Sequence, residues 1–179
     1  MNRRWGGWLA LVLVTIGCAE EPLVPPIQVL SVEFERLYGV WFDIAHLPHE
    51  ISEFCSNTRS LFSESDADSM TFIFECQHPD LFWYHVSGRV VRHPDDSDHF
   101  VFEFDDNPLD VIPRLSFWVL EADWEAGWVC LGNPKEGWFW LWARDSEFDY
   151  VLRETLLDDI EERGLYPALR QEMEYTDHF

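Results

Sequence analysis

Lysine is almost absent from this sequence of 179 residues. Lys135 is the only one, and the remaining basic side chains are arginines, so 12 basic residues stand against 34 acidic ones. The formal net charge is -22. Such a surface repels nucleic-acid phosphates and anionic lipid head groups, and we therefore expect no nucleic-acid partner. We interpret the excess charge as a solvated acidic surface.

The sequence also lacks the short motifs of common enzymes. It contains no G-x-S-x-G, no H-E-x-x-H, no C-x-x-C and no glycine-rich phosphate loop. Two histidine pairs, His46 with His49 and His93 with His99, could ligate a metal, but two histidines make an incomplete site. Glu64, Asp66 and Asp68 could attract calcium, but the EF-hand pattern and its glycine are absent, and a hairpin turn explains them better. We predict no catalytic residue, no metal and no cofactor, with an enzyme acting on a lipophilic substrate kept as an alternative.

No apolar run is long enough to cross a membrane comfortably. The longest, residues 5–16, follows the basic pair Arg3-Arg4 and ends at Gly17-Cys18. This pattern resembles a bacterial lipoprotein signal, although Thr15 departs from the usual leucine. The resemblance implies removal of residues 1–17, lipidation of Cys18, a tether over residues 18–32 and anchoring at the outer membrane, facing the periplasm. An ordinary signal peptide or an uncleaved anchor remains the alternative. In each case the chain is exported, so disulfides become possible.

Aromatic residues are abundant, and they recur in short apolar segments separated by turn formers. Aromatics make up 16% of the chain, including 10 Trp and 14 Phe. The spacing predicts one domain over residues 33–179 with an antiparallel sheet, since no alternation of strands and helices points to a parallel one. The expected strands are 39–46, 56–63, 70–77, 83–92, 99–105, 116–122, 127–132 and 137–143.

A single amphipathic helix is expected after the last strand. Apolar side chains recur at helical spacing from Phe148 to Ile160. Ser146 and Asp149 resemble a capping box at its start, and Gly164 is typical of the residue that follows a helix end. We expect this helix to pack on the outside of the sheet.

The four cysteines are Cys18, Cys55, Cys76 and Cys130. Cys55 and Cys76 lie at equal distances from a turn centred between Ser65 and Asp66. A simple hairpin would place them opposite each other, within disulfide range. We therefore predict a Cys55–Cys76 disulfide and a buried free thiol at Cys130.

Alternation within two strands bears most directly on function. Phe100, Phe102 and Phe104 share one face of their strand, and Trp138, Trp140 and Trp142 share one face of theirs. An eight-stranded barrel has an interior just wide enough for side chains or for one small ligand. The same rings therefore fit either a lined cavity or a solid core.

Three motifs in order resemble the lipocalin family, and within it the bacterial membrane-anchored lipocalins and their apolipoprotein D-like relatives. Gly39-Val40-Trp41 resembles the first-strand G-x-W motif. Ala122-Asp123-Trp124 resembles the T-D-Y turn and departs from it at both outer positions. Residues 138–144 resemble the last barrel strand, which ends in an arginine, here Arg144. The resemblance covers about residues 33–175.

This resemblance implies an eight-stranded antiparallel up-and-down barrel that is closed near Trp41, where Arg144 would lie against the indole ring. Gly39, Trp41, Asp123 and Arg144 would then be structural. The family binds apolar small molecules such as fatty acids or lysophospholipids in the barrel. For the wall of that site we predict Phe100, Phe102, Phe104, Trp138 and Trp140. A structural envelope lipoprotein with a filled barrel is the alternative, and the oligomeric state stays open.

Overall fold

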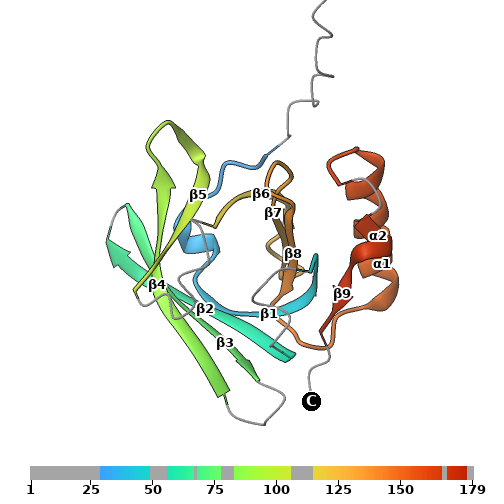
Figure 1. Cartoon of the computed structure of the whole chain (residues 1–179), viewed down its shortest axis with the longest axis horizontal. Helices are drawn as coiled ribbons and strands as arrows, with labels where there is room; N and C mark the ends of the chain where they lie inside the picture. The colour runs from blue at the N-terminus through green and yellow to red at the C-terminus, as the bar shows by residue number, and fades with distance from the viewer. Residues whose placement is uncertain are drawn as a thin grey trace, which may run out of the picture.

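The computed structural model describes residues 29–48, 56–66, 68–77, 83–105, 115–166 and 169–176. Within them, eight long strands form most of the molecule (Figure 1). They are β1 (Gly39–His46), β2 (Ser56–Asp66), β3 (Ser69–Gln77), β4 (Trp83–His93), β5 (Asp96–Phe104), β6 (Ser116–Asp123), β7 (Trp128–Asn133) and β8 (Trp138–Ala143). The strand predictions are confirmed, and β1 has the predicted bounds.

The strands follow one another in an up-and-down order and close into a ring. Each of β2 to β8 pairs antiparallel with its neighbour along the chain, and β1 pairs with both β8 and β2. A short ninth strand, β9 (Glu174–Tyr175), pairs with the far end of β1. The predicted all-β antiparallel fold is confirmed, with β9 as an addition that the sequence did not indicate clearly.

Two apolar clusters stabilise the ring, one inside it and one outside. The inner cluster contains Trp41, Phe100 and Trp140, together with Phe34 from the short 3-10 helix η1 (Phe34–Arg36). The outer cluster lies between the sheet and the C-terminal helices. Because side chains alternate along a strand, β8 supplies both clusters: Trp140 points inward, and Leu141 packs outward.

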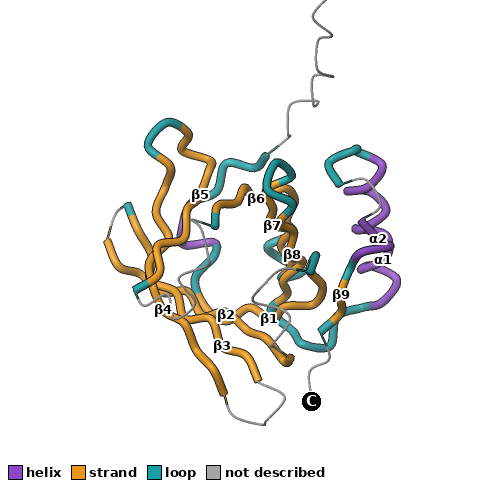
Figure 2. Tube along the Cα trace, in the orientation of Figure 1, coloured by secondary structure: helices purple, strands orange, loops and turns teal. Residues whose placement is uncertain are grey.

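The outer cluster is completed by α1 (Tyr150–Glu162), which lies beside β8 in Figures 1 and 2. Leu156, Leu157 and Ile160 form its buried face. The helix begins one turn later than the sequence indicates, because Asp149 is the N-cap. Its carboxylate accepts a hydrogen bond from the backbone N–H of Leu152 at 2.7 Å. The predicted cap at Ser146 is therefore wrong.

The end of α1 agrees with the sequence. Gly164 follows the C-cap Arg163 and has φ 71°, which is the left-handed conformation expected of this glycine. A second short helix, α2 (Leu169–Glu172), leads into β9. Among the described residues, neither α1 nor α2 has the length and apolar character of a membrane-spanning helix.

The hairpin of β2 and β3 has a different register from the one that the cysteine spacing implied. Asp66 pairs with Ser69, so the turn is centred about two residues later than expected, and Ser56 pairs with Gln77 instead of Glu75, its partner in the expected register. The simple hairpin register from which the pairing was predicted is therefore wrong. Cys76 is nevertheless disulfide-bonded, and because Cys55 lies outside the described residues, its pairing with Cys76 stays a prediction. Cys130 is a buried free thiol, as predicted.

Candidate functional site

One end of the ring is closed by an arginine that covers a tryptophan. The guanidinium carbon of Arg144 lies 3.6 Å from the centre of the Trp41 ring. The same guanidinium donates hydrogen bonds to the carbonyls of Val40 (2.9 Å), Arg36 (3.3 Å) and Tyr38 (2.6 Å). The arginine thus joins η1, the start of β1 and the end of β8. The contact that the family resemblance implied is present.

The glycine of the first motif is required by this packing. Gly39 has φ 101°, a conformation that side chains disfavour, and a Cβ placed there would lie 2.8 Å from Nη1 of Arg144. Asp123 organises the neighbouring turn, because its carboxylate accepts hydrogen bonds from the N–H groups of Glu125 and Ala126. Gly39, Trp41, Asp123 and Arg144 therefore build the closed end.

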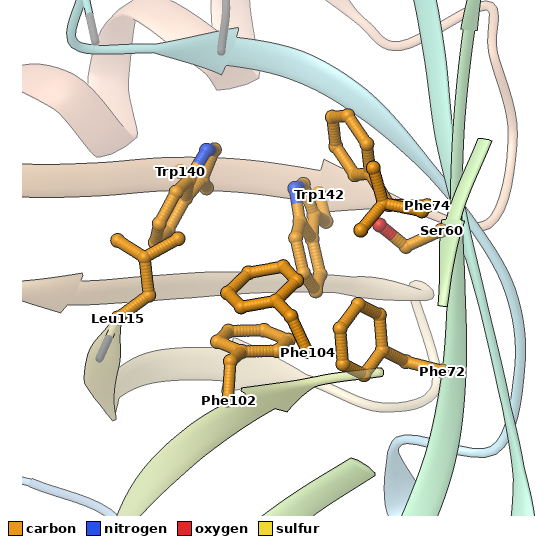
Figure 3. A pocket seen from close by; sticks show the side chains of 9 residues that line it. Ser60, Phe72, Phe74, Phe102, Phe104, Leu115, Trp140 and Trp142 are labelled. Atoms are coloured by element: carbon orange, nitrogen blue, oxygen red, sulfur yellow. The ribbon is translucent and has the colours of Figure 1, made fainter. Parts of the chain in front are cut away.

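Nearer the middle of the ring lies a cavity walled by aromatic rings (Figure 3). Its volume is only about 30 Å³. It is lined by Ser60, Phe72, Phe74, Val86, Phe102, Phe104, Leu115, Trp140 and Trp142. Strands β2 to β5 and β8 all contribute, together with Leu115, the residue before β6. None of these side chains carries a charge, so the cavity is suited to apolar groups.

Three of the five predicted wall residues line this cavity: Phe102, Phe104 and Trp140. Phe100 does not, because it is fully buried against Phe34 and Phe117, with ring centres 5.5 and 5.2 Å away. It forms part of the packed closed end.

Trp138 also stays outside the cavity lining. It stacks on Trp140 at 5.9 Å and is only partly buried. The lining residues that we did not predict include Phe72, Phe74 and Trp142, whose alternation with outward-facing neighbours was visible in the sequence. Ser60 and Val86 carried no comparable signal.

A polar group on the inner face of β1 was also missed. Asp43 and His46 are 3% and 5% exposed, and an Oδ2 of Asp43 lies 2.9 Å from Nδ1 of His46. Asp43 pairs with Trp142 and His46 with Trp140, so both side chains share the face of the cavity rings. Simple alternation puts residues three apart on opposite faces, but a bulge at residues 44–45 restores the same face.

The other ring nitrogen of His46 faces the C-terminal strand. Nε2 of His46 lies 3.1 Å from Oε2 of Glu174 in β9. Burial of His46 by itself lowers its pKa, but the carboxylates of Asp43 and Glu174 outweigh that effect, and the pKa is raised above its ordinary value. The imidazole of His46 thus lies between two carboxylates that favour its protonation.

The two histidine pairs that were considered as metal ligands do not form a described metal site. His93 and His99 stack face to face at 5.0 Å, and His99 stacks in turn on Trp118 at 3.9 Å. Across the described ranges, no group of three or more His, Cys, Asp or Glu side chains is placed to hold a metal ion. His49, like Cys18, lies outside those ranges.

Comparison with known protein families gives one match. A family model described as a lipocalin-like domain matches residues 32–173, which is most of the chain. Comparison with curated proteins finds no match.

Several solved structures have a similar fold. Insecticyanin from the tobacco hornworm Manduca sexta is 15% identical, with a TM-score of 0.66 over 87% of this chain and 86% of that chain. Lobster apocrustacyanin A1 is 12% identical, with a TM-score of 0.63 over 81% and 79%. The siderocalin Ex-FABP, described as having dual ligand specificities, is 12% identical, with a TM-score of 0.56 over 80% and 95%. At these identities the likeness shows the shared fold.

Proposed function

The chain belongs to the lipocalin family, and from this we propose that it binds, stores or transports one small hydrophobic molecule inside its ring of strands. The molecule is of the fatty-acid or lysophospholipid class. The observation that carries the proposal is the uncharged, aromatic-lined cavity between β5 and β8, to which Phe102, Phe104 and Trp140 contribute. Burial of apolar ligand surface stabilises such a complex by roughly 25 cal/mol per Å² before the entropy of association is subtracted.

We further propose that the protein works at the bacterial envelope, held at the outer membrane by a lipid on Cys18 and facing the periplasm. The support is the sequence pattern of Arg3-Arg4, the short apolar run and Gly17-Cys18. An acidic ring on a short tether remains next to the membrane without adhering to its anionic lipids. That arrangement suits a carrier that exchanges ligand with a bilayer.

Binding requires side chains to move. A volume of about 30 Å³ is far below the roughly 300–1,000 Å³ of typical ligand pockets. The rings best placed to move are those that are only partly buried: Phe74, Phe104 and Trp138. Their displacement would exchange protein–protein contacts for contacts with the ligand, so the ligand's own apolar area must offset the lost packing.

The small volume favours a second candidate function. A ring filled by its own aromatic side chains can serve as a structural lipoprotein of the envelope and need not bind anything. The two functions differ in one observable property, which is the uptake of a lipophilic molecule into the ring.

A blocking substitution tests the proposal. Ser60→Phe places a ring in the cavity, whereas Ser87→Phe places the same ring on β4, where Ser87 pairs with the outward-facing Ile73. We expect the wild type and Ser87→Phe to bind N-phenyl-1-naphthylamine, an uncharged fluorophore, with similar affinity. Ser60→Phe should bind it at least about tenfold more weakly, a loss of about 1.4 kcal/mol. Circular dichroism checks that both variants are folded.

Native mass spectrometry of the gently purified wild type complements this titration. A copurifying lipid supports the carrier. If the wild type binds no fluorophore and repeatedly carries no lipid, the carrier function is wrong and the scaffold is favoured.

A further inference from the structure

One inward-facing position of the sheet has no side chain. Along β4 the inner face carries Val86, Gly88 and Val90, and both valines are buried. A Cβ placed on Gly88 would lie 2.8 Å from Cε1 of Phe72 and would also meet the backbone carbonyl of Glu103. The Phe72 ring therefore occupies the space that a side chain at residue 88 would otherwise fill.

Phe72 is held in this position by other aromatic rings. Its ring lies edge-on to Phe102 and Phe104, with ring centres 4.9 and 5.4 Å away and interplanar angles of 80° and 88° (Figure 3). The ring of Phe62 on the neighbouring strand lies 6.4 Å away. Phe72, Phe62 and Phe102 are all buried, whereas Phe74 and Phe104 are only partly buried. Phe72 therefore stays in place when the outer rings move aside for a ligand.

Phe72 also marks how deep the cavity reaches along β3. Phe74 and Phe72 line the cavity, but Met70, the next inward residue toward the closed end, is fully buried and does not. Strand pairing places this level next to the closed end, because Phe72 pairs with Phe62 and Phe62 pairs with Gly39. An acyl chain that enters past Phe74 thus meets the Phe72 ring before it meets the closed end.

We propose that Phe72, seated over Gly88, is the stop that limits the length of the acyl chain in the cavity. The site then accepts fatty acids up to one chain length and gains nothing from longer ones. This inference rests on the proposed function and names a specificity determinant of the same site. The position suits the role because backbone, and not another side chain, lies at Gly88 beside the ring. A smaller residue at position 72 would leave a slot along β4 that Gly88 cannot fill, and a longer chain would extend into it.

A series of saturated fatty acids from octanoate to octadecanoate, used below their micelle concentrations, measures this limit by displacement of N-phenyl-1-naphthylamine. Each buried CH₂ group strengthens binding by about fourfold, so the affinity of the wild type should rise along the series and stop rising at one chain length. In Phe72→Ala the rise should continue past that length. The first longer fatty acid should bind this variant at least about fourfold more tightly than it binds the wild type. A wild-type affinity that rises through the whole series overturns the inference.

Two further variants test whether the effect belongs to this position. Phe139→Ala removes the same ring from the outer cluster, where Phe139 is fully buried against Tyr166, and should leave the limit unchanged. Phe72→Leu is the milder change and should move the limit in the same direction as Phe72→Ala; it decides alone if circular dichroism shows that Phe72→Ala does not fold.

The inference and the proposed function fail in different ways. If the wild type binds fatty acids but the limit stays the same in the folded variants of Phe72, or shifts equally in Phe139→Ala, the inference is overturned and the proposed function stands. If neither the probe nor any fatty acid binds the wild type, the proposed function is wrong, and the inference fails with it.

Discussion

At the scale of single residues, Arg144 does the most to hold the closed end together. It covers the Trp41 ring and donates to three carbonyls of residues 36–40. These carbonyls belong to η1, the loop after it and β1, so one side chain satisfies backbone groups of three segments. A guanidinium that stacks on an aromatic ring and donates to several carbonyls stabilises the fold more than an exposed ion pair does, because the protein shields it from water on one side.

We expect Arg144→Gln to lower the free energy of unfolding by about 2–4 kcal/mol, since it removes the cation–π contact and most of the hydrogen bonds. Urea unfolding followed by tryptophan fluorescence measures this change. Arg89→Gln is the matched control: it breaks an exposed pair with Glu103, and the expected loss is below about 1 kcal/mol. Equal losses in the two variants would contradict the role assigned to Arg144.

His46 makes the stability depend on pH. Its pKa is raised in the folded protein because, despite burial, Asp43 and Glu174 favour the imidazolium. A raised pKa contributes stability that is fully present below the unfolded-state pKa of about 6.5 and is lost as the pH rises through the folded-state pKa. The contribution of His46 should therefore be largest in mildly acidic solution.

Comparison of the wild type with His46→Gln isolates this contribution, because other titrating groups are common to both. We expect the variant to be less stable by about 3–5 kcal/mol near pH 6, where a buried ion pair is broken. The difference should shrink as the pH rises above 6.5. Urea unfolding across a series of pH values measures it, and a difference that stays constant with pH would show that His46 is not charged in the folded protein.

At the scale of elements, the sequence predicted helix α1 correctly but placed its N-cap one turn too early. Ser146 and Asp149 both resemble helix caps, but only Asp149 has extended backbone angles followed by a helical residue and bonds to the N–H of Leu152. We expect Asp149→Ala to lower the free energy of unfolding by about 1 kcal/mol, whereas Ser146→Ala should change it little. Thermal unfolding of both variants gives the comparison, and the reverse order of stabilities would contradict the cap.

The strands were predictable from the sequence because each one alternates and ends at turn formers. What alternation could not supply is the register. The bulge at residues 44–45 of β1 brings Asp43 and His46 to one face, and the later turn of the β2–β3 hairpin pairs Ser56 with Gln77 instead of Glu75. A bulge or a shifted turn changes every following cross-strand contact without changing the local sequence pattern.

At the scale of the whole molecule, the sequence predicted the closed ring and its closed end, and it predicted part of the cavity wall. Phe102, Phe104 and Trp140 line the cavity, whereas Phe100 packs against Phe117 nearer the closed end and Trp138 is not part of the lining. The strand pattern shows only that an aromatic side chain points into the closed sheet. How far along the axis of the sheet that side chain lies depends on the stagger between strands, which the pattern does not contain.

The last strand, β9, also bears on self-association of the protein. β1 pairs with β2 only over Gly39 to Phe42, and at Ala45 and His46 its partner is β9 instead. A chain shortened before Glu174 would leave that stretch of backbone as an open edge, with N–H and C=O groups ready to pair with a strand from another molecule. The two residues of β9 thus satisfy the backbone groups of β1 that β2 does not reach, and so cover an edge through which copies of the protein could otherwise associate.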